Sequence, residues 1–89
     1  MKEIEIGQIV FSKQGRDKAK PFVVVNIEEN FLYLVDGKLR KAENSKKKKR
    51  IHIQHTNYVD INLKEKILNQ NYLDSDFRTA IKSYLAEEG

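Results

Sequence analysis

Three clusters of cationic side chains are the features of this 89-residue chain that most clearly suggest a binding chemistry. Arginine presents a planar fork of donors that matches a phosphate, and lysine presents a mobile positive charge. The first cluster comprises Lys13, Arg16, Lys18 and Lys20; the second comprises Lys38, Arg40 and Lys41; the third comprises Lys46, Lys47, Lys48, Lys49 and Arg50. This mixture suits a nucleic-acid backbone better than it suits one small anion.

The cations are concentrated in the first two thirds of the chain. Residues 1–57 hold 13 Lys and Arg against 7 Asp and Glu, whereas residues 58–89 hold 4 against 6. Such asymmetry is typical of a chain in which one region faces a polyanion. The alternative interpretation is a solvated charged surface that serves only solubility.

Patterns for catalysis and metal binding are missing from the sequence. There is no cysteine, and the two histidines, His52 and His55, would lie on opposite faces of a strand. No close carboxylate pair completes a metal shell, and there is no glycine-rich phosphate loop or nucleophile elbow. The sequence therefore predicts a non-catalytic protein without a cofactor or a metal ion.

Cysteine usage and hydropathy bear on where the protein works. The absence of cysteine favours a reducing, cytoplasmic setting. The longest purely apolar stretch, FVVV at 22–25, is too short for a membrane span, and the N-terminus lacks the apolar block of a signal peptide. We expect a cytoplasmic monomer that makes no contact with a membrane.

The cationic clusters fall among short segments with the pattern of β-strands. Segments rich in β-branched and aromatic residues, bounded by turn-forming or lysine clusters, lie at 7–12, 22–27, 31–36 and 51–55. The turn signal Asp36-Gly37 predicts a fifth short strand over 39–42, and the lysine run at 46–49 is expected to be flexible. Short, closely spaced strands favour a strongly bent, partly open barrel over residues 1–57.

The periodicity changes after Asn57. Apolar residues at 77, 80, 81, 84 and 85 share one face of a helix predicted over 74–87. A shorter helix is predicted at 63–69, with Leu63, Ile67 and Leu68 facing inward. We expect residues 58–89 to form a helical extension packed on the barrel, because a helix of this length is marginal alone. The fold class is therefore mainly β with C-terminal α.

The loop between the first two predicted strands has the features of a shaped binding turn. Gly15 allows a positive φ and a close approach to a ligand, so that Arg16 and Lys18 project from the tip. Asp17 is expected to accept a hydrogen bond from a neighbouring backbone N–H and so hold the turn. A rigid glycine turn that carries paired cations suits recognition of structured RNA by its shape and phosphates.

The same residues carry a resemblance to a known family. The stretch GQIVFSKQGRDKAKPFVVVNI at 7–27 resembles a KOW motif, with a leading glycine, apolar alternation and a central glycine in a basic loop. Together with DGKLRK at 36–41, it is similar to KOW-domain proteins related to large-subunit ribosomal proteins of archaea and eukaryotes, which have short bacterial versions described as RNA-binding. The resemblance covers residues 4–57.

This resemblance implies an SH3-like barrel of about five strands whose first loop contacts RNA, with the contacts carried over to Gly15, Arg16, Asp17 and Lys18. The chain departs from many relatives at Ala19, where they carry a second glycine. The predicted function is that of a non-catalytic RNA-binding protein, with ribosomal RNA or the ribosome as its partner. A protein-interaction domain that binds a transcription or translation factor remains the alternative. A third reading takes KKKKR as a nuclear signal or an anionic-lipid patch.

Overall fold

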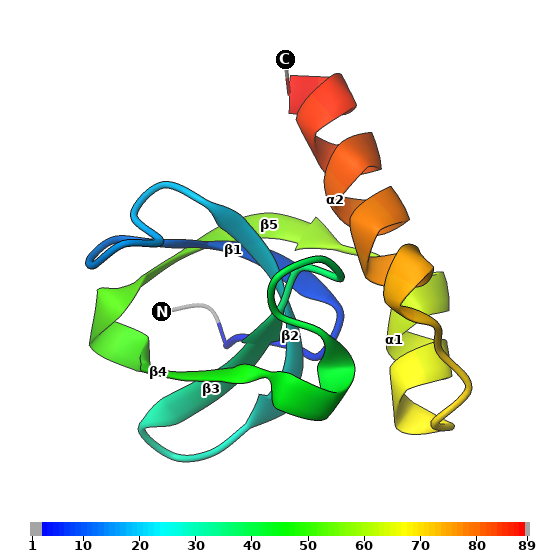
Figure 1. Ribbon diagram of the computed structural model, residues 1–89, viewed down its shortest axis with the longest axis horizontal. Coiled ribbons are helices and arrows are strands. Elements are labelled where there is room, and N and C mark those ends of the chain that lie inside the picture. Colours follow the sequence, from blue (N-terminus) through cyan, green and yellow to red (C-terminus); the bar gives the residue numbers. More distant parts are fainter. Residues whose placement is uncertain (1–2, 89) are drawn as a thin grey trace.

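The computed structural model describes residues 3–88 and consists of one curved sheet followed by two helices (Figure 1). Residues 1 and 2 of the predicted barrel and residue 89 of the predicted helical extension lie outside the described residues. The strands are β1 (Gln8–Ser12), β2 (Pro21–Ile27), β3 (Phe31–Val35), β4 (Lys46–Lys49) and β5 (Ile53–Val59); the helices are α1 (Ile61–Leu68) and α2 (Asp74–Glu88). Short 3₁₀ helices occupy Ala42–Asn44 and Arg50–His52.

All five strands are antiparallel to their neighbours, in the order β4-β3-β2-β1-β5. The two edge strands, β4 and β5, are joined by the 3₁₀ turn at Arg50–His52. Register shifts between Gln8 and Val10 and between Val24 and Asn26 mark irregularities of the kind that increase local twist. The sheet therefore bends into a small open barrel, as Figure 1 shows. The predicted mainly β fold with C-terminal helices is confirmed.

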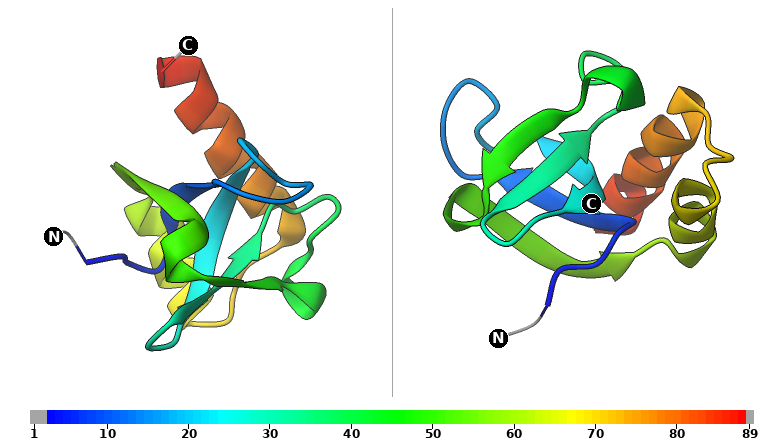
Figure 2. Two further views of the ribbon diagram at one scale, coloured as in Figure 1. Left: turned by 90° about the vertical axis from the view of Figure 1, so that its left-hand side faces the viewer. Right: turned by 90° about the horizontal axis from the view of Figure 1, so that it is seen from below.

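The sheet is buried on both faces over much of its area. The barrel interior is filled by Val10, Phe22, Val24, Leu32, Leu34 and Ile53. The opposite face packs against the helices through residues such as Ile9 and Val23, which are fully buried against Leu63 and Phe77. Figure 2 shows both helices on the same side of the sheet. Burial on both faces explains why β2 reads as a continuous apolar run and not as a simple alternation.

The helical periodicity correctly identified most of the packed face of α2. Phe77, Ala80, Ile81 and Tyr84 are buried, as predicted. Leu85, which was predicted to face inward with them, is 45% exposed. In α1, Leu63 and Ile67 are buried, but Leu68, the last residue of the helix, is 58% exposed. Both leucines are therefore corrections to the predicted core.

The strand predicted at 39–42 is not formed, and the lysine run forms the fifth strand in its place. A turn occupies 36–40, in which the Asp36 carboxylate accepts hydrogen bonds from the backbone N–H groups of Lys38 (2.8 Å) and Arg40 (2.9 Å). The chain then reaches the sheet only at Lys46, which pairs with Leu34 at the start of β4. The last strand also begins later than predicted, at Ile53, and continues to Val59.

Candidate nucleic-acid interface

The loop between β1 and β2 is a compact turn closed by backbone hydrogen bonds. The Ala19 N–H donates to the Ser12 carbonyl (2.7 Å), and the Lys18 N–H donates to the Gly15 carbonyl (3.2 Å). Gly15 has a φ of +81°, as its predicted role requires. Ala19 has a φ of +67°, a left-handed conformation that glycine adopts more readily than alanine. Arg16 is exposed at the tip.

Two lysines of β4 hold this loop against the barrel. Lys46 forms an ion pair with the Asp17 carboxylate, and both side chains are only about one quarter to one fifth exposed (25% and 18%). Lys48 donates hydrogen bonds to the Ser12 hydroxyl (2.5 Å) and to the Gln14 carbonyl (2.6 Å). The lysine run was predicted to be flexible, but it forms an ordered strand whose alternate members contact the loop.

The alternation follows directly from the pairing of β4 with β3. Lys46 and Lys48 lie opposite the buried Leu34 and Leu32, so their side chains are on the face that lines the barrel. Their ammonium groups contact polar groups of the β1–β2 loop and of Ser12, at the end of β1. The Asp17 carboxylate accepts from Lys46, so the prediction that it holds the turn through a neighbouring backbone N–H is wrong.

These contacts shift the pKa values of Asp17 and Lys48. The hydrogen bond from Lys46 holds the pKa of the Asp17 carboxyl below its usual value, and the charges of Lys46, Lys20 and Lys48 add to this effect against the cost of burial. Burial lowers the pKa of Lys48, and the nearby charge of Lys46 lowers it further. Lys46 and Lys48 therefore anchor the loop, and their ammonium groups are engaged by partners within the protein.

The other two lysines of β4 lie on the outer face of the sheet. Lys47 is over the Phe31 ring, 4.5 Å from its centroid, and 5.8 Å from the centroid of Tyr33. Its ammonium group is also 3.5 Å from the Glu28 carboxylate, whose charge raises the pKa of Lys47. Lys47 therefore lies over two partly buried aromatic rings. Lys49, like Lys47, is exposed.

Arg50 and the turn at 36–41 complete the predicted set. Arg50 is half-buried, and its Nε donates to the Glu28 carbonyl (3.4 Å), which directs it toward the β2–β3 hairpin. In the turn, Lys38 and Lys41 are exposed and Arg40 is half-buried. The turn itself packs on α2, where the Arg78 Nη1 donates to the Gly37 carbonyl (2.5 Å).

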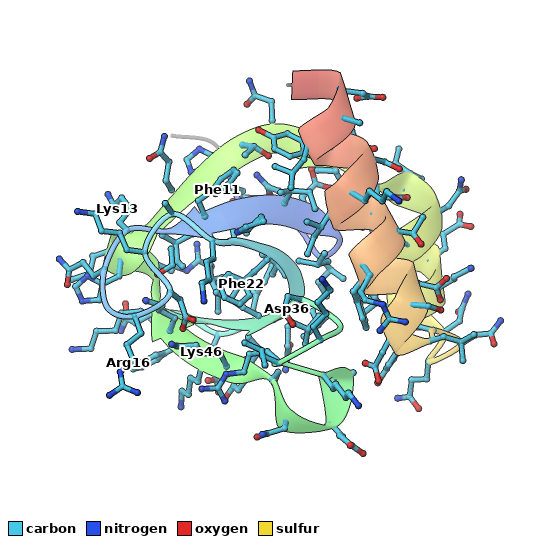
Figure 3. All side chains as sticks on the ribbon, turned by 45° about the horizontal axis from the view of Figure 1, so that its top comes forward. Phe11, Lys13, Arg16, Phe22, Asp36 and Lys46 are labelled. Atoms are coloured by element: carbon cyan, nitrogen blue, oxygen red, sulfur yellow. The ribbon has the colours of Figure 1, made fainter. Side chains whose placement is uncertain are left out.

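The structure therefore brings together the first and third cationic clusters, at the end of the barrel away from the helices. Figure 3 shows Lys13, Arg16 and Lys46 gathered at this end. The second cluster lies at another edge, beside α2, and only Lys20 of the first cluster approaches it. Two cations that the sequence analysis missed, Arg78 and Lys82, lie next to this second cluster. Their spacing of four residues on a predicted helix was the available signal.

Other kinds of site find little support in the described part of the chain. Within residues 3–88, no group of three or more His, Cys, Asp or Glu side chains is placed to hold a metal ion. Neither helix in this range has the length and apolar character needed to cross a bilayer. His52 and His55 are set on the 3₁₀ turn and on β5, with His55 paired with Val10 across the sheet.

Comparison with known proteins identifies the family. No protein-family model matches the chain. The chain is similar to the large ribosomal subunit protein eL14 of Sulfolobus acidocaldarius, with 33% identity over 82 residues that cover 92% of this chain and 80% of the relative. The predicted relationship to large-subunit ribosomal proteins of archaea and eukaryotes is thereby confirmed. The chain belongs to the family of the large ribosomal subunit protein eL14.

Proposed function

We propose that this protein is a non-catalytic RNA-binding protein that binds structured ribosomal RNA as a monomer in the cytoplasm. The observation that carries the proposal is the β1–β2 loop, which two lysines of β4 hold in place while Arg16 and Lys18 remain exposed at its surface. Membership of a ribosomal protein family supports the ribosome as the site of action. We further propose that residues 1–57 form an SH3-like KOW barrel that carries the main phosphate contacts, with 58–89 as a helical extension packed on it.

The mechanism follows from the rigidity of the loop. A lysine or arginine on a mobile segment loses side-chain and backbone freedom when it contacts a phosphate, and this loss opposes binding. In the β1–β2 loop much of that order exists before binding, because backbone hydrogen bonds and the Lys46–Asp17 pair fix the turn. Arg16 and Lys18 are then presented at a fixed separation, which favours an RNA whose groove places phosphates to match.

The first test is the salt dependence of binding to fragments of large-subunit ribosomal RNA, measured by fluorescence anisotropy. The slope of log K against log salt concentration is expected to be about −0.7 to −0.9 per neutralised phosphate, or roughly −3 to −6 for four to seven contacts. A slope near zero contradicts the proposal, because phosphate contacts release counterions. Such a result, together with a protein recovered by crosslinking, would favour the protein-interaction domain.

The second test uses matched loss of charge. Arg16→Ala with Lys18→Ala removes two cations from the loop, and Lys64→Ala with Lys66→Ala removes two from α1, at the opposite side of the molecule in Figure 1. The loop variant is expected to weaken binding by at least tenfold more than the α1 variant, because each lost phosphate contact costs a charge-assisted hydrogen bond. Equal losses would mean that net charge alone attracts the RNA. Sequencing of crosslinked RNA and cosedimentation with ribosomal subunits then identify the RNA.

A further inference from the structure

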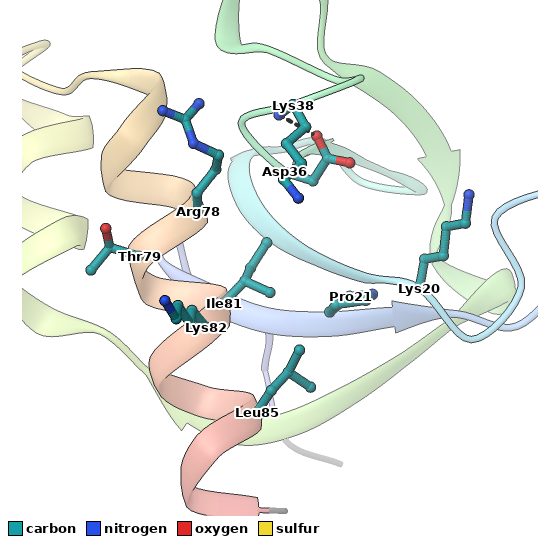
Figure 4. A pocket seen from close by; sticks show the side chains of 9 residues that line it. All are labelled: Lys20, Pro21, Asp36, Lys38, Arg78, Thr79, Ile81, Lys82 and Leu85. Atoms are coloured by element: carbon teal, nitrogen blue, oxygen red, sulfur yellow. Dashed lines mark hydrogen bonds between the residues drawn. The ribbon is translucent and has the colours of Figure 1, made fainter.

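A cavity of about 620 Å³ lies between the start of β2, the turn at 36–40 and α2. This volume is within the range of about 300 to 1,000 Å³ that is usual for sites that take small ligands. Figure 4 shows Ile81 and Leu85 of α2 pointing toward Pro21, with Lys20 beside Pro21 and Lys38 on the turn. The cavity therefore has an apolar floor and a rim of cations from three separate elements.

The charges of the lining are strongly unbalanced. Four cations border the cavity, Lys20, Lys38, Arg78 and Lys82, against the single carboxylate of Asp36. That carboxylate already accepts two backbone N–H groups of its own turn, so it is occupied in shaping the turn. None of the four cations forms an ion pair with a carboxylate among the described residues. The unpaired positive charges of the rim therefore favour binding of an anion.

One of these cations has a fixed orientation. The Arg78 Nη1 donates to the Gly37 carbonyl (2.5 Å), so the plane of the guanidinium is held by the turn. Gly37 itself lies so close to α2 that a Cβ atom there would be 2.4 Å from the Asp74 carbonyl oxygen. The contact between turn and helix is therefore tight, so the turn that carries Lys38 has a fixed position on α2.

We propose that this cavity binds one unpaired nucleotide of the RNA, with the base against Leu85 and Pro21 and the phosphate at Lys20 and Lys38. The inference rests on the proposed function, and it adds a site that reads RNA structure to a loop that contacts phosphates. Unpaired bases are the parts of an RNA that proteins can hold by stacking and apolar contact, whereas a paired stem offers mainly phosphate and groove.

Continuity with the loop favours a nucleotide over an acidic peptide. Lys20 ends the β1–β2 loop and Pro21 begins β2, so the cavity starts where the proposed phosphate contacts end. A backbone that follows the exposed cations of the loop would reach the cavity without leaving the protein surface. The combination of a cationic rim and an apolar floor also matches the two parts of a nucleotide, its phosphate and its base.

The test compares two fluorescein-labelled RNA hairpins, one with a fully paired stem and one with the same stem and a single bulged adenosine. The full chain is expected to bind the bulged hairpin more tightly than the paired one. Leu85→Ser removes part of the apolar floor without a change of charge, at a side chain that is 45% exposed. We expect this variant to lose about three- to tenfold in affinity for the bulged hairpin and to bind the paired hairpin as before.

The matched control is Leu68→Ser, the same change at a leucine that is 58% exposed on α1, outside the cavity. It is expected to keep the preference for the bulged hairpin. Methyl NMR of Ile81 and Leu85 should show shifts on addition of the bulged hairpin and not of the paired one.

The outcomes separate the two proposals. If the wild-type chain binds neither hairpin, the inference is overturned, and binding to the ribosomal RNA fragments then shows whether the proposed function is overturned with it. If both hairpins bind equally and binding still depends on Arg16 and Lys18, the function stands and only the cavity assignment is overturned. A Leu85→Ser variant that weakens both hairpins alike also overturns it. If a hexaglutamate peptide shifts the cavity methyl groups and the bulged hairpin does not, the cavity belongs to a protein partner.

Discussion

The inner and outer lysines of β4 should have different effects when they are removed, although each pair carries the same charge. Lys46→Met with Lys48→Met removes the contacts to the β1–β2 loop and keeps the aliphatic part of each side chain. Lys47→Met with Lys49→Met removes two charges from the outer face. If the inner lysines anchor the loop, only their removal should lower stability and loosen the loop.

The magnitude follows from the contacts that are lost. Without Lys46, the Asp17 carboxylate, only 18% exposed, loses its charged partner, at a cost of about 1.5 to 3 kcal/mol. Lys48→Met removes the hydrogen bonds to Ser12 and Gln14, but it also removes a partly buried ammonium group, so the net cost is about 0.5 to 1 kcal/mol. The inner double variant should therefore be less stable by about 2 to 4 kcal/mol.

Urea unfolding followed by circular dichroism measures this difference, and hydrogen exchange locates it. The Ala19 and Lys20 amides, which donate to the Ser12 and Asp17 carbonyls, should exchange faster in the inner variant only. The outer variant should keep its unfolding midpoint but lose about 1 to 2 units of salt slope in RNA binding. Equal midpoints for the two double variants, with unchanged loop exchange, would refute the anchoring of the loop by Lys46 and Lys48.

Three further predictions concern stability. Gly37→Ala should cost about 2 to 4 kcal/mol, because its Cβ would meet the Asp74 carbonyl oxygen. Gly15→Ala, at nearly the same φ but with only the Lys48 Nζ near its Cβ, at 3.8 Å, should cost about 1 kcal/mol in the same urea titration. Ile81→Asp should bury an unpaired charge at a side chain that is 9% exposed and lower stability by several kcal/mol, about 3 or more; an unchanged melting temperature would mean that this face is an interface. The pKa of Asp17 is depressed in the folded state, so the carboxylate stabilises the fold at pH values above its unfolded pKa of 3.8 and this stabilisation is lost as the pH falls through the folded pKa. The difference in unfolding free energy between wild type and Asp17→Asn should therefore shrink between pH 6 and pH 2.

Local patterns in the sequence were sufficient for much of the fold. The apolar segments at 7–12, 22–27 and 31–36 became β1, β2 and β3, because β-branched and aromatic residues bounded by turn signals leave few other solutions. The spacing of Phe77, Ala80, Ile81 and Tyr84 identified the packed face of α2. Gly15 was correctly expected at positive φ, because glycine adopts this conformation without steric cost.

The lysine run shows the limit of this kind of inference. Four identical residues have no hydrophobic periodicity, so nothing local distinguishes a solvated segment from an edge strand with alternate side chains turned inward. The strand forms because β3 offers a ladder of backbone partners, and because Asp17 and the Gln14 carbonyl receive the inner ammonium groups. Those partners are about 30 residues away along the chain, as the pairs Lys46–Asp17 and Lys48–Gln14 show.

The sequence by itself determined the composition of the candidate interface: which residues are cationic, which loop needs a glycine, and which segments are strands or helices. The tertiary structure alone decided which of these cations are exposed, which anchor the loop, and which border a cavity with Arg78 and Lys82. The physical reason is that charge and backbone propensity belong to single residues and their close neighbours. Exposure, pairing and enclosure depend instead on how β4, the loop and α2 meet in space.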